Sequence, residues 1–428
     1  MPKIELHTTV EEIMVCEDIP GFTIKKINLG KNRFWTPWRG IYLSTDIPAN
    51  IRKAILEMMG RQNRLFEINR TIYRDISYEA INYAIEEGDQ ERIKDVLRVN
   101  DYLSDNANIL IPLSFSDFPS NKMGDNFEEL LDYIHAFSSI PFVPHVRYGK
   151  AKTSQKYSAK YFCKYVDGAI NIFQERNAKP LFVPFDIEYD KITRNEILTH
   201  YAEQGYTNIW IDFKGRVFSK VMIGKMRILW RIIAKKFGKN AENVVVYLAN
   251  IKKIPRVTPR DIRISPSDFL AVFSYGDIVG APWKGIMAFH QTEEGEEYWV
   301  KKGYSDRVSY EMDMFRRDCS IFESQTYYYI HPDKIKIDNP RLEGLKRNIF
   351  NIDISRKYIA EKISYSISGI LTLNELNQVK KNVENNRKIA DYVGDKEFFQ
   401  REGSTLLKEL KKSKDVRHRK EKSLFDFI

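Results

Sequence analysis

The sequence has few cysteines and no long apolar run. Its only cysteines are Cys16, Cys163 and Cys319, which lie far apart. An odd number of widely spaced cysteines excludes a disulfide framework and a zinc site of the Cys-x-x-Cys kind. No apolar stretch approaches the length of about 20 residues that a membrane-spanning helix needs. The opening MPKIELHTTVEEIM lacks the basic and apolar segments of a secretory signal, so we expect a cytoplasmic protein.

Several cofactor motifs are also missing. The sequence contains neither GxxxxGK[ST] nor GxGxxG, so an ATP-driven motor and a Rossmann-type dehydrogenase are not expected. Its seven histidines show no HxH or HExxH spacing, which argues against a histidine-rich metal site. The formal net charge of +10 favours contact with a polyanion, although a solvated Lys/Arg-rich surface explains it equally well.

The middle of the chain alternates short apolar runs with amphipathic helices. Such alternation is typical of parallel βαβ units, and nearly continuous apolar strands indicate a sheet covered on both faces. The expected strands are NILIPLSFS, IPFVPHVRYG, PLFVPFDIEY, NIWIDFKG, NVVVYLANI and DFLAVFSYGDIVG. A doubly wound sheet would also fit, but the absence of a Gly-rich nucleotide loop favours a TIM-like (β/α) barrel. We expect an N-terminal α+β region (1–105), the barrel-like catalytic domain (106–340), a helical region (341–400) and a basic tail (401–428).

Polar residues follow most of the expected strands. In parallel α/β proteins the reactive groups lie at the carboxyl ends of the strands, although polar residues there also cap helices or meet water. The candidates are Ser116, Asp117, His145, Arg147, Tyr148, Asp186, Glu188, Asp190, Asp212, Lys214, Arg216, Asn250, Lys252, Tyr275 and Asp277.

The stretch FDIEYD holds the densest group of carboxylates. Asp186 and Glu188 are two residues apart, so on a strand they would point to the same face and could share a divalent metal. The stretch resembles the first motif of exonucleases with the ribonuclease-H-like fold. That resemblance implies a metal-dependent DNA nuclease that uses magnesium or manganese. Outside this hypothesis no cofactor is expected.

A second resemblance concerns the order of the elements. The βα series, with Asp117 ending an early strand, Asp277 in the late FSYGDIVGAP and a later helical NIFNIDISRKYIAEKI, is similar to the tRNA-guanine transglycosylase superfamily. The resemblance implies an α/β barrel that exchanges a base through an aspartate nucleophile, and one branch of the superfamily acts on DNA. Asp277 or Asp212 would then be the nucleophile, and Asp117 the acid/base.

Basic and aromatic residues occur together near the N-terminus. Two tryptophans among cations could stack on the bases of DNA or RNA, although a hydrophobic plug at one end of the barrel is an equal alternative. The nucleic-acid-binding candidates are Arg33, Trp35, Trp38, Arg39, Lys214 and Arg216.

The last eight residues, EKSLFDFI, follow a run of lysines and arginines. Glu421, Leu424, Phe427 and Ile428 have the spacing of a PCNA-interacting peptide, whose single 3₁₀ turn gathers the apolar side chains into a plug. The resemblance implies a sliding-clamp (PCNA) partner and favours an archaeal source. An exposed apolar end is a liability unless a partner covers it, but docking on the protein's own surface is the alternative. A non-catalytic, clamp-bound adaptor is a third hypothesis for the whole chain.

Overall fold

The structure, a computed structural model, describes most of the chain. The described residues are 8–30, 32–59, 64–72, 79–115, 125–146, 159–176, 179–253, 263–283, 299–300, 303–352 and 356–412. Three antiparallel strands come first, namely β1 (Thr8–Val15), β2 (Thr23–Leu29) and β3 (Asn32–Trp35).

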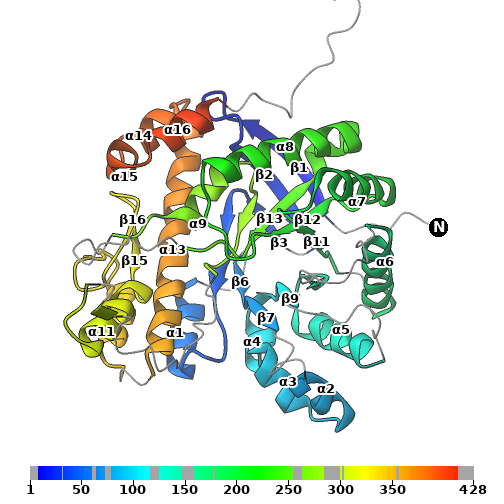
Figure 1. Cartoon of the computed structure of the whole chain (residues 1–428), viewed down its shortest axis with the longest axis horizontal. Helices are drawn as coiled ribbons and strands as arrows, with labels where there is room; N and C mark the ends of the chain where they lie inside the picture. Colours follow the sequence, from blue (N-terminus) through cyan, green and yellow to red (C-terminus); the bar gives the residue numbers. More distant parts are fainter. Residues whose placement is uncertain are drawn as a thin grey trace, which may run out of the picture.

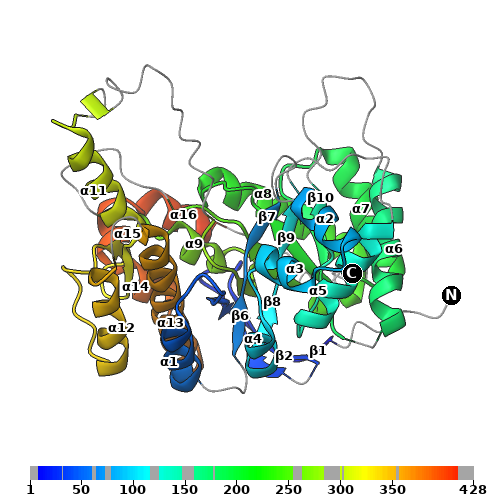
Figure 2. The same ribbon diagram turned by 90° about the horizontal axis from the view of Figure 1, so that it is seen from below.

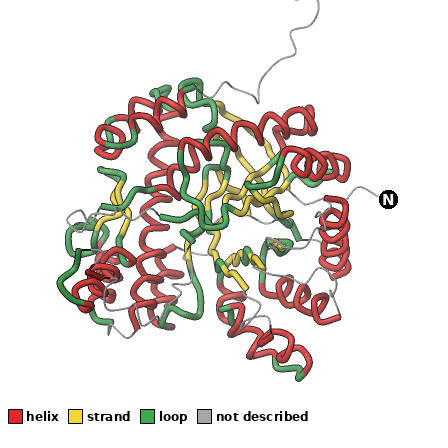
Figure 3. The backbone as a smooth tube through the Cα atoms, viewed as in Figure 1, coloured by secondary structure: helices red, strands yellow, loops and turns green. Residues whose placement is uncertain are grey.

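Short parallel strands form the centre of the fold (Figures 1 and 3). Parallel pairing joins them in the orders β11-β12-β13-β14-β4, β5-β6-β8 and β10-β9-β7. Their bounds are β4 (Trp38–Arg39), β5 (Ile41–Tyr42), β6 (Leu65–Glu67), β7 (Arg70–Ile72), β8 (Asn108–Leu110), β9 (Leu113–Phe115), β10 (His145–Val146), β11 (Val183–Asp186), β12 (Asn208–Asp212), β13 (Val245–Ala249) and β14 (Ile278–Val279). An α/β fold with parallel strands, as the apolar runs predict, is therefore confirmed.

Helices surround these strands. Every residue of β12 and β13 is buried, because α8 packs an apolar face that includes Met226, Trp230 and Ile233 over the sheet. The helices between the strands are α1 (Ala49–Met59), α2 (Glu79–Glu86), α3 (Gln90–Leu97), α4 (Asp101–Asn106), α5 (Asp125–Phe137), α6 (Ala159–Arg176), α7 (Lys191–Gln204), α8 (Lys220–Phe237) and α9 (Ser267–Leu270), with 3₁₀ turns η2 (Gly238–Asn243) and η3 (Ala271–Phe273).

Only β1, β2 and β3 of the predicted N-terminal region form a sheet of their own. Strands β4 to β7 fall within residues 1–105, yet β4 pairs with β14, and β6 and β7 pair with β8 and β9. These strands are only two or three residues long, too short for a hydrophobic pattern to reveal them.

A long helix attaches the C-terminal part to the strands. Within the region 341–400 that the sequence predicts to be helical, α13 (Lys357–Glu384) runs without a break. The helix crosses β5 closely, since a Cβ atom on Gly369 would lie 3.3 Å from the Cα of Ile41, and the Ser366 hydroxyl donates to the Tyr42 carbonyl at 2.7 Å. The other elements there are α11 (Arg307–Asp318), β15 (Ile321–Glu323), β16 (Tyr328–Ile330), α12 (Pro340–Phe350), α14 (Ile389–Gly394), α15 (Glu397–Arg401) and α16 (Ser404–Lys411).

None of the helices within the described ranges has both the length and the apolar composition needed to cross a membrane.

A buried ion pair joins the parallel strands to the C-terminal part. Arg39 on β4 lies 2.5 Å from the carboxylate of Asp268 on α9, and both side chains are almost fully buried. The hydroxyl of Tyr329 on β16 donates to the same carboxylate at 2.7 Å. Because the cost of burying each charge is offset only while both remain, the loss of one partner should be far more damaging than the loss of both.

We expect Arg39→Met to lower the free energy of unfolding by about 3–5 kcal/mol, because it leaves the charge of Asp268 buried without its partner. The double variant Arg39→Met/Asp268→Leu should recover a large part of that loss. Urea denaturation measures both values. A double variant as unstable as the sum of the two single variants would contradict this coupling.

Candidate active site

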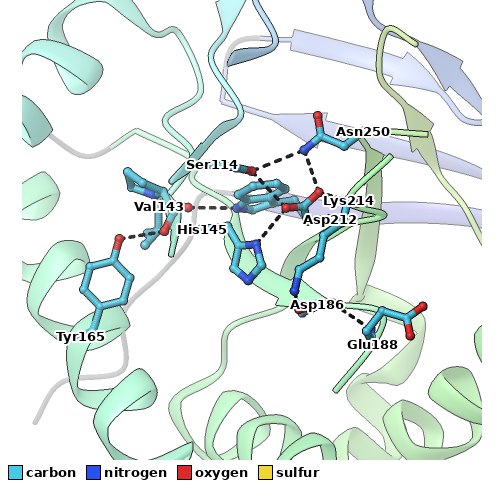
Figure 4. A network of polar contacts seen from close by, with 11 residues as sticks. Ser114, Val143, His145, Tyr165, Asp186, Glu188, Asp212, Lys214 and Asn250 are labelled. Atoms are coloured by element: carbon cyan, nitrogen blue, oxygen red, sulfur yellow. Dashed lines mark hydrogen bonds and ion pairs between the residues drawn. The ribbon is translucent and has the colours of Figure 1, made fainter. Parts of the chain in front are cut away.

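Polar side chains from four neighbouring segments meet at the carboxyl ends of the parallel strands (Figure 4). Ser114 on β9 pairs with His145 on β10, and Asp212, the last residue of β12, pairs with Ala249 on β13. Asn250 follows Ala249 directly. In Figure 2 this end of the strands faces upward, with β7 and β10 toward the top and the β1–β2 hairpin at the bottom.

The carboxylate of Asp212 is the centre of this cluster. Its Oδ2 accepts a hydrogen bond from Ser114 Oγ at 3.0 Å and is 2.9 Å from His145 Nδ1. Its Oδ1 accepts from Asn250 Nδ2 at 2.7 Å and from the backbone N–H of Lys214 at 2.8 Å. These four donors use the acceptor positions that a carboxylate offers. Asp212 is therefore better arranged to orient its neighbours than to attack a substrate.

His145 is held in one tautomer by this contact. An ionised Asp212 can only accept, so the network assigns the ring proton to Nδ1 and leaves Nε2 as an acceptor. Within the described ranges Nε2 is buried and has no hydrogen-bond partner. The rings of Phe162, Tyr189 and Trp210 surround the imidazole edge-on, with centroids 5.8 to 6.5 Å away. A buried, unpaired ring nitrogen opposite a histidine–carboxylate contact is the arrangement of a general base.

Two further hydrogen bonds fix the backbone just before His145. The indole N–H of Trp210 donates to the carbonyl of Val143 at 3.0 Å, and the hydroxyl of Tyr165 donates to the carbonyl of Pro144 at 2.7 Å. Strand β12 and helix α6 thus set the position of the imidazole.

The two carboxylates of FDIEYD do not form a metal pair in this structure. Asp186 ends β11, is buried, accepts the backbone N–H of Glu188 at 2.8 Å and forms an ion pair with Lys214. Glu188 lies beyond the strand, is partly exposed and binds Lys225 at 2.7 Å. Each carboxylate therefore has its own lysine. In the part of the chain that the structure describes, no three His, Cys, Asp or Glu side chains converge as a metal site.

Asp277 lies at the opposite end of the strands from Asp212. It precedes β14, where its carboxylate binds Lys25 of β2 at 3.0 Å and the backbone N–H of Val246 at 2.8 Å. Val246 lies three residues before Ala249, the residue that pairs with Asp212, so Asp277 and Asp212 are separated by roughly 10 Å along the strands.

The run DFLAVFSYG, which the sequence predicts to be part of a strand, forms α9 and η3 instead. A short buried apolar run does not distinguish strand from helix.

The other expected contact residues are dispersed. Arg33 is exposed and paired with Glu11, and Trp35 is half-buried beneath Lys26. Trp38 and Arg39 are 5% and 1% exposed, which corrects the expectation that they present faces to a nucleic acid. Arg216 is exposed next to Lys214 at the carboxyl ends of the strands. Residues outside the described ranges are Ser116, Asp117, Arg147, Tyr148, Glu421, Leu424, Phe427 and Ile428.

Sequence reasoning gave Ser114 no role, and it placed His145 among the strand-end candidates without a catalytic role. Ser114 is a single polar residue inside an apolar run, and nothing in the sequence marks its partner. The position of His145 at the end of IPFVPHV was the available signal, because it places an imidazole where reactive groups gather.

Another buried carboxyl group, that of Glu67, lies in the interior. The side chain of Glu67 on β6 accepts from the Tyr247 hydroxyl at 2.6 Å and the Ala281 backbone N–H at 2.5 Å. Gly40 and Gly280 leave room for it, since a Cβ on Gly280 would lie 2.5 Å from the carboxyl oxygen. Burial raises the pKa of Glu67 to about 7, although the two hydrogen bonds act in the opposite direction.

The chain matches no protein-family model and no curated protein. The geometry at the carboxyl ends of the strands therefore carries the functional argument.

The pKa of Glu67 predicts a pH-dependent stability. In the folded state Glu67 takes up a proton below about pH 7, whereas the unfolded chain does so only below the ordinary value of 4.5. Between these values the folded state binds the extra proton, so the free energy of unfolding should fall by about 3 kcal/mol as pH rises from 4.5 to 7. Glu67→Gln should lose this dependence. Urea denaturation of both proteins at several pH values measures it, and parallel profiles would contradict the assignment.

Proposed function

We infer that the parallel strands form a TIM-like (β/α) barrel. Eight successive strand segments of the described chain support this: β4–β5, β6–β7, β8–β9, β10, β11, β12, β13 and β14. Neighbours along the chain pair in parallel, an isolated parallel bridge joins Phe142 to Phe182 between the fourth and fifth segments, and β14 pairs with β4. The carboxyl-end cluster then occupies the usual position of a barrel active site.

We propose that the protein is a DNA-acting enzyme that exchanges or modifies a base, with His145 as general acid/base and Asp212 as its positioning residue. The observation that carries the proposal is the buried, unpaired Nε2 of His145 opposite the 2.9 Å contact with Asp212. Base exchange requires a proton for the departing base and its removal from the incoming base. His145 as imidazolium would give a proton to the departing base, and the neutral imidazole would then take a proton from the incoming base. That second transfer restores the imidazolium, which the carboxylate of Asp212 stabilises.

The net charge and the C-terminal peptide support DNA as the substrate, as does the resemblance to the DNA-acting transglycosylases. That resemblance assigns the nucleophile to Asp277 or Asp212. The four hydrogen bonds to Asp212 and the ion pair of Asp277 with Lys25 favour neither. The nuclease hypothesis has less support, because Asp186 and Glu188 are each bound to a lysine. The adaptor hypothesis gives no role to the unpaired Nε2 of His145.

We expect the full chain to incorporate labelled guanine or deazaguanine into DNA, and His145→Asn to reduce the rate about 10²–10⁴-fold. Asparagine keeps a donor for Asp212 but has no equivalent of Nε2. The matched control is His200→Asn on α7, which removes another histidine–carboxylate contact, that of His200 with Asp167 at 2.8 Å, far from the strand ends. Incorporation counted by scintillation gives the rates.

Equal rates for His145→Asn and the wild-type protein would refute the role of His145. Magnesium- or manganese-dependent cutting of DNA that disappears in Asp186→Ala would replace base exchange by the nuclease. If neither activity is found while the clamp is retained, the adaptor hypothesis is the one that remains.

We further propose that the last eight residues bind the sliding clamp. The spacing of Leu424, Phe427 and Ile428 supports this, and tethering to a clamp raises the local concentration of an enzyme on long DNA.

Deleting residues 424–428 should abolish binding to purified PCNA in calorimetry without changing the melting temperature. Lys408→Gln on α16 is the control that leaves the peptide intact. A large fall in melting temperature on deletion would instead show that the peptide docks on the protein's own surface.

A further inference from the structure

The first turns of α6, α7 and α8 share a feature that the candidate active site does not explain. Each contains a lysine followed by a large apolar residue, and all six side chains are exposed. The apolar members Tyr161, Ile192 and Val221 are 74%, 71% and 66% exposed, among the highest values for large apolar side chains of the described chain. We call this set the rim: Lys160–Tyr161, Lys191–Ile192 and Lys220–Val221.

The rim lies at the same end of the fold as His145. Each of these helices follows one parallel strand and returns to the next, so its first turn is beside the carboxyl ends of β10, β11 and β12. Because neighbouring helices pack about 10 Å apart, the three first turns span about 20 Å of surface. The figures agree, since α6, α7 and α8 are consecutive around the strands (Figure 1).

The rim lysines lie at helix ends that already carry a partial positive charge. The N-terminus of a helix is its positive end, where lysine is unfavourable and an acidic residue is stabilising. α3 and α12 follow that rule with Glu91 and Glu343, whereas α6, α7 and α8, like α1, α11 and α13 elsewhere in the fold, have no acidic residue in their first turns.

Local acids compensate the rim only in part, through Glu409 on α16, whose pKa is lowered by the hydrogen bond from Arg227 and, more weakly, by Lys220 without a direct ion pair. Across the described residues, none of the three rim lysines forms an ion pair. Asp190, the N-cap of α7, is engaged with backbone N–H groups, and Glu188 is bound to Lys225. Three cations at three positive helix ends therefore form a surface complementary to an external polyanion.

The exposed apolar side chains of the rim indicate which kind of polyanion would bind there. A duplex presents phosphates outward and hides the faces of its bases, so it would leave Tyr161, Ile192 and Val221 in water. An unpaired strand offers both phosphates for cations and base faces for aromatic and aliphatic side chains. Alternating lysine and apolar residues beside the carboxyl ends of the strands match that chemistry.

We propose that the rim binds single-stranded DNA and leads it across the carboxyl ends of β10, β11 and β12 to His145. The choice of DNA rests on the proposed function. The choice of a single strand comes from the exposed apolar members.

The experiment measures binding of the full chain to fluorescein-labelled single-stranded DNA of about 20 nucleotides by anisotropy over a range of salt. The triple variant Lys160→Gln/Lys191→Gln/Lys220→Gln should bind at least about 10-fold more weakly. Its slope of log affinity against log salt should shrink by about 2, since each phosphate contact contributes about 0.7. Tyr161→Gln should weaken binding about 5-fold or more with little change of slope.

The control triple variant Arg231→Gln/Lys235→Gln/Lys239→Gln removes the same charge toward the other end of α8, where all three side chains are exposed. Its affinity should stay within about twofold of the wild-type value. An equal loss in the control, or tighter binding of the matched duplex or of single-stranded RNA than of single-stranded DNA, would overturn the proposal. Unchanged melting temperatures exclude misfolding.

The catalytic assay separates the two proposals. If base exchange occurs, the rim variant should raise the KM for DNA and leave kcat unchanged, because no rim residue reaches His145. If the wild-type protein binds single-stranded DNA through the rim but exchanges no base, the proposed function fails and the rim proposal survives. If exchange occurs and the rim variant keeps its KM, only the rim proposal fails.

Discussion

The buried carboxylate of Asp212 is the interaction on which the candidate active site depends. Its partners Ser114, His145 and Asn250 come from segments that are 98, 67 and 38 residues away in the chain. A carboxylate without donors would be very costly in this interior. The strands must therefore keep their register to supply those donors. The hydrogen bonds that stabilise the buried charge also fix the orientation of the imidazole. The burial of this charge and the proposed catalytic geometry therefore depend on the same side chain.

The sequence predicts the central fold well because its strands are nearly continuous apolar runs. β11, β12 and β13 lie where PLFVPFDIEY, NIWIDFKG and NVVVYLANI indicate them. The segments around β4 and β14 are different, since two-residue strands carry no periodicity and their place is set by pairing with distant segments. Asp277 was misplaced relative to its strand for this reason, and the error moved it to the wrong end of the sheet.

Residue types at the strand ends were predictable, but their partners were not. Asp212 and His145 both follow expected strands, yet their contact depends on β10 and β12 sharing a level, and on Trp210 fixing the carbonyl of Val143. The same limit explains Asp186 and Glu188. Spacing of two residues suggests a shared face only while the strand continues, and the strand ends at Asp186, where the chain turns and each carboxylate meets a lysine.

Charges of opposite sign lie in the interior and on the surface at the carboxyl ends of the strands. Acidic side chains such as Asp186 and Asp212 are buried at the carboxyl ends of the strands, where the positive ends of α6, α7 and α8 help to stabilise them. Lysine is an unfavourable residue at such a helix end, where α3 and α12 have a glutamate instead. Exposed lysines there weaken the helices slightly while extending a positive potential into solvent. Such a compromise of local stability is expected where a surface must attract an anionic substrate, and it points to the same end of the strands as the buried histidine does.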